Sequence, residues 1–266
     1  MINWTLYRQG LKSNYKTLLL FMLVLSLYFL SIIWMFDPTL GKALQQMAKA
    51  MPEMMAMFGM DDAGSTLTSF LSTYLYGMLM LVLPLLFTII LANRLVSRHV
   101  DQGSMVFLLA APVSRKTVAL TQLCVLLTCL VSLIAFCTVI GIIASEVLYP
   151  GELDIAAFIR VNAGVLCLHF FIGGLCFFTS CFFNETRTNL GVCSGVAIVS
   201  YLFQMLANMG DKLELLKYMT FFTLFDSNGL LAGDTGAYIM ASVLFAAGAV
   251  LYTVSVNIFD KRDLPI

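Results

Sequence analysis

The 266-residue chain is 60% hydrophobic and only 11% charged, and its formal net charge is zero. Soluble domains carry about 25% charged residues, so the composition excludes a water-soluble globular protein. The neutral charge balance argues against nucleic acid as a partner, because nucleic-acid binding requires a basic field. We therefore expect an integral membrane protein whose solvent is the lipid bilayer.

The first sixteen residues, MINWTLYRQGLKSNYK, combine apolar and aromatic side chains with three basic ones. This pattern predicts an amphipathic interfacial helix over residues 1–16 that lies among the lipid headgroups; an ordinary flank with an aromatic anchor is the alternative. The apolar run that follows is long enough to span the bilayer and lacks a small-residue cleavage site. We therefore expect this run to be retained as the first span.

Six apolar stretches are each long enough to cross a bilayer, which takes about 20 residues in helical conformation. Helices are expected because unpaired backbone groups are too costly in hydrocarbon. The predicted fold class is all-α, with one polytopic transmembrane domain over residues 1–266. The spans are expected at about 17–36, 69–92, 117–144, 161–183, 190–209 and 237–259.

The distribution of lysine and arginine predicts the orientation of the spans. Ten of the fifteen basic residues fall on one side, in the amino terminus, the 93–116 connector, the 184–189 turn and the carboxyl terminus. An excess of lysine and arginine is typical of the cytoplasmic side of a membrane protein. We therefore expect both termini and the connector to be cytoplasmic.

Two long segments lie on the opposite side. Residues 37–68 carry six methionines between Met47 and Met60. They indicate either a soft-metal site, because thioethers favour Cu(I), or an amphipathic helix on the membrane surface. No cysteine or histidine accompanies the methionines, which favours the helix. Residues 210–236 are too apolar for free solvent and too interrupted to span, so we expect a re-entrant hairpin before the last span.

Catalytic and metal-binding patterns are missing from the sequence. No HExxH spacing occurs, and no GxxxxGK[ST] loop is present to bind nucleotide phosphates. Of the two histidines, His99 lies in the connector, whereas His169 lies within a span as a proton relay or as a neutral imidazole bonded to a neighbouring helix. The seven cysteines fall in apolar runs and are expected to be packing residues. We assign no catalytic residue, metal or cofactor to this chain, and we do not expect an enzyme.

The connector between the second and third spans contains a short apolar run, residues 105–111, which is too short to span. Asp101 and Gly103 predict a turn before it, and Ser104 or Asp101 can cap the short helix that follows. Pro112 ends that helix, and Ser114 is placed to cap the third span. The expected product is an apolar knob that suits a groove on a soluble partner.

Residues 101–123, DQGSMVFLLAAPVSRKTVALTQL, resemble the connector of bacterial ABC-2 type permeases, whose pattern is E-x-G-[ST]-x-x-x-L-L-x-x-P-[VI]-S-R. The basic start, the six spans, the hairpin before the last span and the tail FDKRDLPI are also similar to that family. The chain departs from the family at Asp101, where glutamate is usual, and at Gln122, where a lysine often lies. The matching positions are Asp101, Gly103, Ser104, Leu108, Leu109, Pro112, Val113, Ser114 and Arg115.

The resemblance implies a permease subunit of a type V ABC exporter in the bacterial plasma membrane. Two permeases, identical or related, pair in that family, and each contacts a cytoplasmic ATPase subunit through its connector. ATP and magnesium are bound by that ATPase. The residues expected to couple this chain to the ATPase are Asp101, Gly103, Met105, Phe107, Leu108, Leu109, Pro112, Ser114 and Arg115.

In that family the substrate path lies between the first, second and fifth spans. The fifth span of this chain carries Ser200, Gln204 and Asn208 on one helical stripe, with Tyr201 beside them. Polar side chains within a span face protein or a watered cavity, so these residues are compatible with a substrate path. Hydrogen bonding between helices without substrate contact is the alternative interpretation.

The second and fifth spans also contain glycines, and the second contains a proline, which affect how helices pack. Gly191 and Gly195 form a small-xxx-small pair in the fifth span, which predicts close helix packing. In the second span, Gly77 and Pro84 permit close packing or a kink. None of these residues needs to contact a substrate.

Two other functions are compatible with the sequence. A membrane sensor or assembly scaffold would use the same ATPase contact without transport. A self-sufficient channel or secondary carrier would move solute without an ATPase. The interiors of the predicted spans contain no acidic residue, which argues against an ion-coupled carrier.

Overall fold

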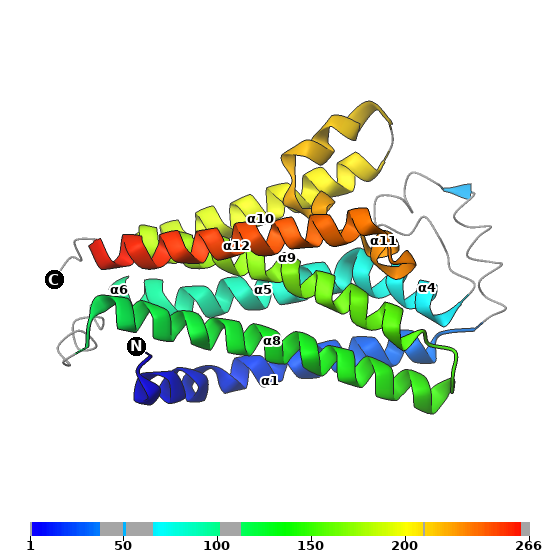
Figure 1. Cartoon of the computed structure of the whole chain (residues 1–266), viewed down its shortest axis with the longest axis horizontal. Helices are drawn as coiled ribbons and strands as arrows, with labels where there is room; N and C mark the ends of the chain where they lie inside the picture. The colour runs from blue at the N-terminus through cyan, green and yellow to red at the C-terminus, as the bar shows by residue number, and fades with distance from the viewer. Residues whose placement is uncertain (1, 38–49, 52–65, 102–112, 210, 262–266) are drawn as a thin grey trace.

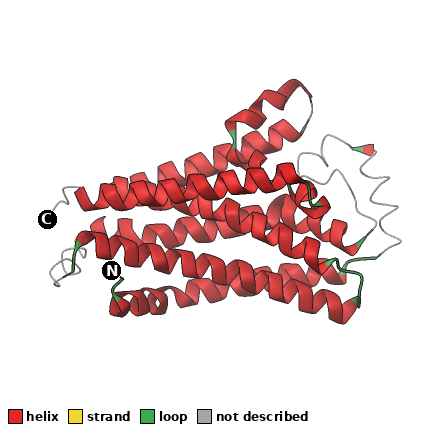
Figure 2. Ribbon diagram, viewed as in Figure 1, coloured by secondary structure: helices red, strands yellow, loops and turns green. Residues whose placement is uncertain are grey.

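The computed structural model of the chain describes residues 2–37, 50–51, 66–101, 113–209 and 211–261 (Figure 1). Within these ranges all regular structure is helical (Figure 2). The helices are α1 (Trp4–Trp34), α4 (Leu67–Leu71), η1 (Ser72–Leu79), α5 (Met80–Ala92), η2 (Asn93–Ser97), α6 (Arg98–Asp101), α8 (Arg115–Leu148), α9 (Ile155–Phe182), α10 (Thr186–Asn208), η3 (Asp211–Met219), η4 (Phe221–Leu224), α11 (Ser227–Ala232) and α12 (Thr235–Lys261).

Six helical segments in the described part of the chain are long and apolar enough to cross a membrane, which confirms the predicted all-α polytopic fold. The second segment joins α4, η1, α5, η2 and α6 in one run, Leu67–Asp101. The six segments lie along the long axis of the molecule, and the start of α1 and the end of α12 lie at the same end of the bundle (Figure 1).

The amino-terminal segment is helical, as predicted, but it is continuous with the first span. A single helix, α1, runs from Trp4 to Trp34. Its early turns pack on α8: a Cβ added to Gly10 would lie 2.9 Å from Val125 Cγ2. The hydroxyl groups of Tyr7 and Thr128 are 2.9 Å apart. These contacts hold the first turns of α1 against the bundle.

The second span departs from α-helical geometry at η1 and η2, where the backbone is π-helical. Pro84 lies within α5 and has no backbone N–H, so the Met80 carbonyl lacks its usual intrahelical partner. His169 of α9 replaces that partner, with its Nε2 2.8 Å from the Met80 oxygen. A carbonyl oxygen only accepts hydrogen bonds, so the imidazole donates. This contact supports the interpretation of His169 as a ring bonded to a neighbouring helix.

Helices α9 and α12 pack closely through glycine. A Cβ added to Gly174 would lie 3.1 Å from the backbone oxygen of Gly248, and one added to Gly248 would lie 3.1 Å from Cα of Phe171. At the predicted packing pair, Gly191 and Gly195, an added Cβ would meet no atom of the described residues within 4 Å. Within the described residues no helix packs on that pair, so its close packing stays a prediction; the glycine surfaces that meet belong to α9 and α12.

Residues 211–232 fold as three short helices that lead the chain from α10 back to α12. Arg160 of α9 donates from Nε and Nη2 to the carbonyl oxygens of Leu230 and Leu231, at 3.2 and 2.9 Å. The side chain of Leu230 also occupies the space that a Cβ on Gly164 would need. The segment predicted to form a hairpin is thus held against α9 by two hydrogen bonds and by the packing of Leu230 on Gly164.

Candidate functional site

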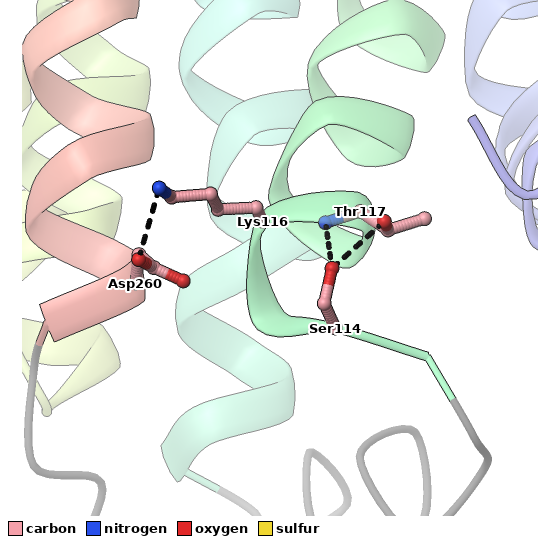
Figure 3. Close-up of polar contacts among 4 residues, drawn as sticks. All are labelled: Ser114, Lys116, Thr117 and Asp260. Carbon is pink, nitrogen blue, oxygen red and sulfur yellow. Dashed lines mark hydrogen bonds and ion pairs between the residues drawn. The ribbon is translucent and has the colours of Figure 1, made fainter. Parts of the chain in front are cut away.

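The structure describes the two edges of the predicted coupling connector. Asp101 is the last residue of α6, and Arg115 is the first residue of α8. The Ser114 side chain accepts the backbone N–H of Thr117 at 3.3 Å, which confirms the predicted cap of the third span (Figure 3). The remaining predicted coupling residues lie outside the described residues: Gly103, Met105, Phe107, Leu108, Leu109 and Pro112.

An ion pair joins the start of α8 to the end of α12. Lys116 Nζ lies 3.4 Å from Asp260 Oδ2 (Figure 3). The two side chains are 56% and 31% exposed, and exposed ion pairs contribute only about 0–1 kcal/mol. The pair therefore orients the two helix ends more than it stabilises the fold. It places the end of the last span beside the edge of the connector.

A buried polar cluster joins the second, fourth and fifth spans near the same end of the bundle. Asn189 of α10 donates from Nδ2 to Asn93 Oδ1 at 3.1 Å and to Ser180 Oγ at 3.0 Å. Ser97 in η2 donates to the Ser180 carbonyl oxygen at 3.4 Å. Hydrogen bonds are strong in this low-dielectric setting. Sequence reasoning missed the cluster, although asparagines at the edges of two apolar spans were a signal for it.

The predicted polar stripe on α10 meets the segment that follows it. Gln204 Nε2 donates to Asn208 Oδ1 at 3.2 Å. The Thr223 hydroxyl lies 2.7 Å from Gln204 Oε1, and the rings of Tyr201 and Phe222 meet edge to face with centroids 5.5 Å apart. The stripe is therefore partly engaged in contacts between the fifth span and η4, as the alternative interpretation requires.

Three of the four predicted path residues also line a cavity of about 180 Å³: Tyr201, Gln204 and Asn208. Tyr76 of η1 also lines it, so the cavity is between the second and fifth spans. Ser200, the fourth predicted residue, is buried and is not part of this lining. The cavity thus lies between these two spans, and Ser200 does not line it.

The cavity offers hydrogen-bonding groups in fixed positions. The hydroxyl of Tyr76 accepts from Asn162 Nδ2 at 2.6 Å. Asp226, which lines the cavity from the turn between η4 and α11, accepts the backbone N–H of Gly229 at 2.9 Å and caps α11. Amide, phenol and carboxylate groups held in this way suit recognition of a polar group. In the part of the chain that the structure describes, no group of three His, Cys, Asp or Glu side chains is placed to hold a metal ion.

The fold and this cavity define the class of protein: a multi-pass α-helical membrane protein with a small polar cavity in an apolar bundle. A family model described as a protein of unknown function (DUF2705) matches residues 43–265, so the chain belongs to this family. No curated protein matches the chain in sequence.

Proposed function

We propose that the chain is the permease subunit of an ATP-driven exporter in the bacterial plasma membrane. A second permease completes the substrate path, and a separate cytoplasmic ATPase binds ATP and magnesium. Both termini and the connector face the cytoplasm. The observation that carries the proposal is the polar cavity between the second and fifth spans, in a chain whose connector resembles that of ABC-2 type permeases.

The contacts around the connector support its role as a mechanical link. Its first edge, α6, is continuous with the second span, and its other edge is the start of the third span. In η2, the helix that precedes α6 in the chain, Asn93 is hydrogen-bonded to Asn189 of α10. A force on the connector that displaces the end of the second span therefore acts directly on the fifth span, which lines the cavity.

The exposure of α10 supports pairing with a second permease. Only 22% of its most apolar stretch is buried within the chain. Gly191 and Gly195 face space that no described residue fills, and small residues of this kind let membrane helices approach closely. A second permease packed there completes the contact that these glycines do not make within one chain.

The decisive experiment replaces Leu108 and Leu109 with aspartate and measures co-purification with the proposed ATPase subunit. Two charges on an apolar docking surface remove its fit to a hydrophobic groove, so association is lost while membrane insertion persists. The matched control is Leu215→Asp with Met219→Asp, two exposed apolar residues of η3. Normal co-purification of the Leu108/Leu109 variant contradicts the docking role.

Reconstitution separates transport from the alternatives. A permease complex hydrolyses ATP faster when its substrate is present, whereas a sensor or scaffold shows no such stimulation. A self-sufficient channel or carrier produces flux in liposomes that contain this chain alone. Flux without an ATPase contradicts the proposal.

A further inference from the structure

A second cavity, of about 580 Å³, is lined by the first turns of α1, by η2 and α6, and by the second turn of α8. In the second span, η2 and α6 form the end opposite to η1. It is separate from the cavity against α10, and the proposed transport function does not use it. Its lining includes Gln9 of α1, Arg94 of η2, Arg98 and His99 of α6, and Gln122 of α8. The cavity is thus a polar, cationic recess in an apolar bundle.

Among the described residues, no acidic side chain compensates the positive charge of this cavity. Two guanidinium groups, Arg94 and Arg98, lie four residues apart on one helix, where like charges repel. No described acidic side chain lines the cavity, and neither arginine forms an ion pair with a described residue. Arg94 donates from Nη1 to the hydroxyl of Thr17 on α1, which directs this guanidinium toward the first helix. An anion placed between the two arginines would relieve their repulsion.

A buried polar group faces the same cavity. Gln122 is only 3% exposed and lines the recess. Its Oε1 has no hydrogen-bond partner among the described residues, although a buried acceptor without a partner costs about 1–3 kcal/mol. A ligand that brings a hydroxyl group, or the water bound to that ligand, supplies the missing donor.

The cavity lies at the level of the lipid headgroups. Helix α1 has 31 residues, so it is about 46 Å long at 1.5 Å per residue, longer than the hydrocarbon layer of about 30 Å. Trp4 and Tyr15, which flank the cavity-lining residues of α1, are 71% and 47% exposed. Such aromatic side chains are typical of the membrane interface. The recess therefore opens where lipid phosphates lie.

We propose that this cavity binds a phosphate ester between Arg94 and Arg98. Arginine is suited to this ligand because its planar guanidinium donates two parallel hydrogen bonds to phosphate oxygens. The ester is either the headgroup of an anionic phospholipid or a soluble phosphate compound, and both present the same anion to the two guanidinium groups. The inference stands independently of the permease function.

The test uses the purified full chain in neutral detergent and four probes: dioleoyl phosphatidylglycerol, dioleoyl phosphatidylcholine, glycerol 3-phosphate and inorganic phosphate. Binding is measured by native mass spectrometry and by the shift of the thermal unfolding midpoint. Phosphatidylglycerol is expected to bind and to stabilise the chain. The dissociation constant is expected to rise about tenfold for each arginine replaced, in Arg94→Gln, Arg98→Gln and the double variant, because each loses a charge-assisted contact.

Two further variants control for folding and for general charge. Arg94→Lys with Arg98→Lys keeps the charges but not the paired hydrogen bonds, so it is expected to bind more tightly than the double glutamine variant and more weakly than the parent chain. Arg187→Gln removes an exposed arginine of α10 that does not line the cavity, and it is expected to bind like the parent chain.

The probes also identify the source of the phosphate. Arginine-dependent binding of phosphatidylglycerol alone assigns the site to a lipid headgroup, and equal arginine-dependent binding of glycerol 3-phosphate or inorganic phosphate assigns it to a soluble ester. Binding of every probe that is unchanged in the two single glutamine variants overturns the proposal. So does an equal loss of binding in Arg187→Gln.

Discussion

Helices α9 and α10 are consecutive and both are apolar enough to span a membrane, yet the protein buries them very differently. In α9, 61% of the most apolar stretch is buried, against 22% in α10. Glycine has opposite roles in the two helices: Gly174 of α9 meets the backbone of α12, whereas Gly191 and Gly195 of α10 face open space. The comparison teaches that the chain packs closely around α9, whereas it leaves most of the apolar surface of α10 uncovered.

The largest expected effect comes from filling the contact between α9 and α12. Gly248→Leu forces a side chain against Phe170 and the Phe171 backbone, and overpacking of this kind destabilises by about 1–3 kcal/mol. The free energy of unfolding in mixed micelles measures the loss. The matched control is Gly191→Leu, where the added side chain meets open space.

Equal destabilisation by the two leucine substitutions would break the comparison between α9 and α10. Loss of self-association in Gly191→Leu, with unchanged stability of the single chain, would sharpen it by showing that the open face of α10 receives a partner.

An effect of similar size concerns the hydrogen bond that α9 gives to the second span. His169→Leu removes the donor to the Met80 carbonyl and leaves a buried acceptor unsatisfied, so we expect a loss of about 1–3 kcal/mol in unfolding free energy. Pro84→Ala restores a backbone N–H four residues after Met80. In the Pro84→Ala background, His169→Leu should therefore cost about 1 kcal/mol less.

The double-mutant cycle separates this structural role from a proton relay. His169→Gln retains a donor and should keep most of the stability. If the cycle shows no coupling between Pro84 and His169, the imidazole has some role other than replacing the missing backbone donor.

The smallest effect on stability is expected on α10 itself. Gln204→Leu and Asn208→Leu remove a side-chain hydrogen bond in a partly exposed cluster, which costs about 0.5–1.5 kcal/mol. The same changes remove polar groups from the cavity, so substrate-stimulated ATP hydrolysis by the reconstituted complex should fall. Leu202→Ala, an exposed residue of α10, is the control. Unchanged stimulation in both cavity variants would make the polar stripe a packing feature.

Part of the candidate site could be predicted because its residues are near one another in the chain. Gln204 and Asn208 are one helical turn apart, so their pairing follows from helix geometry. Ser114 caps α8 through Thr117, three residues later. The contribution of Tyr76 to the same cavity could not be predicted, because it depends on how η1 lies against a helix more than a hundred residues further along the chain.

The sequence by itself determined that this protein belongs in a membrane, that it has six spans and that they are helices. These properties follow from local composition and from the cost of unpaired backbone groups in hydrocarbon. Only the tertiary structure decided which glycines meet, which carbonyl His169 satisfies, and that two arginines share a recess with Gln122. In lipid, apolar surface does not select one helix neighbour over another, so steric fit and polar contacts between distant segments make that choice.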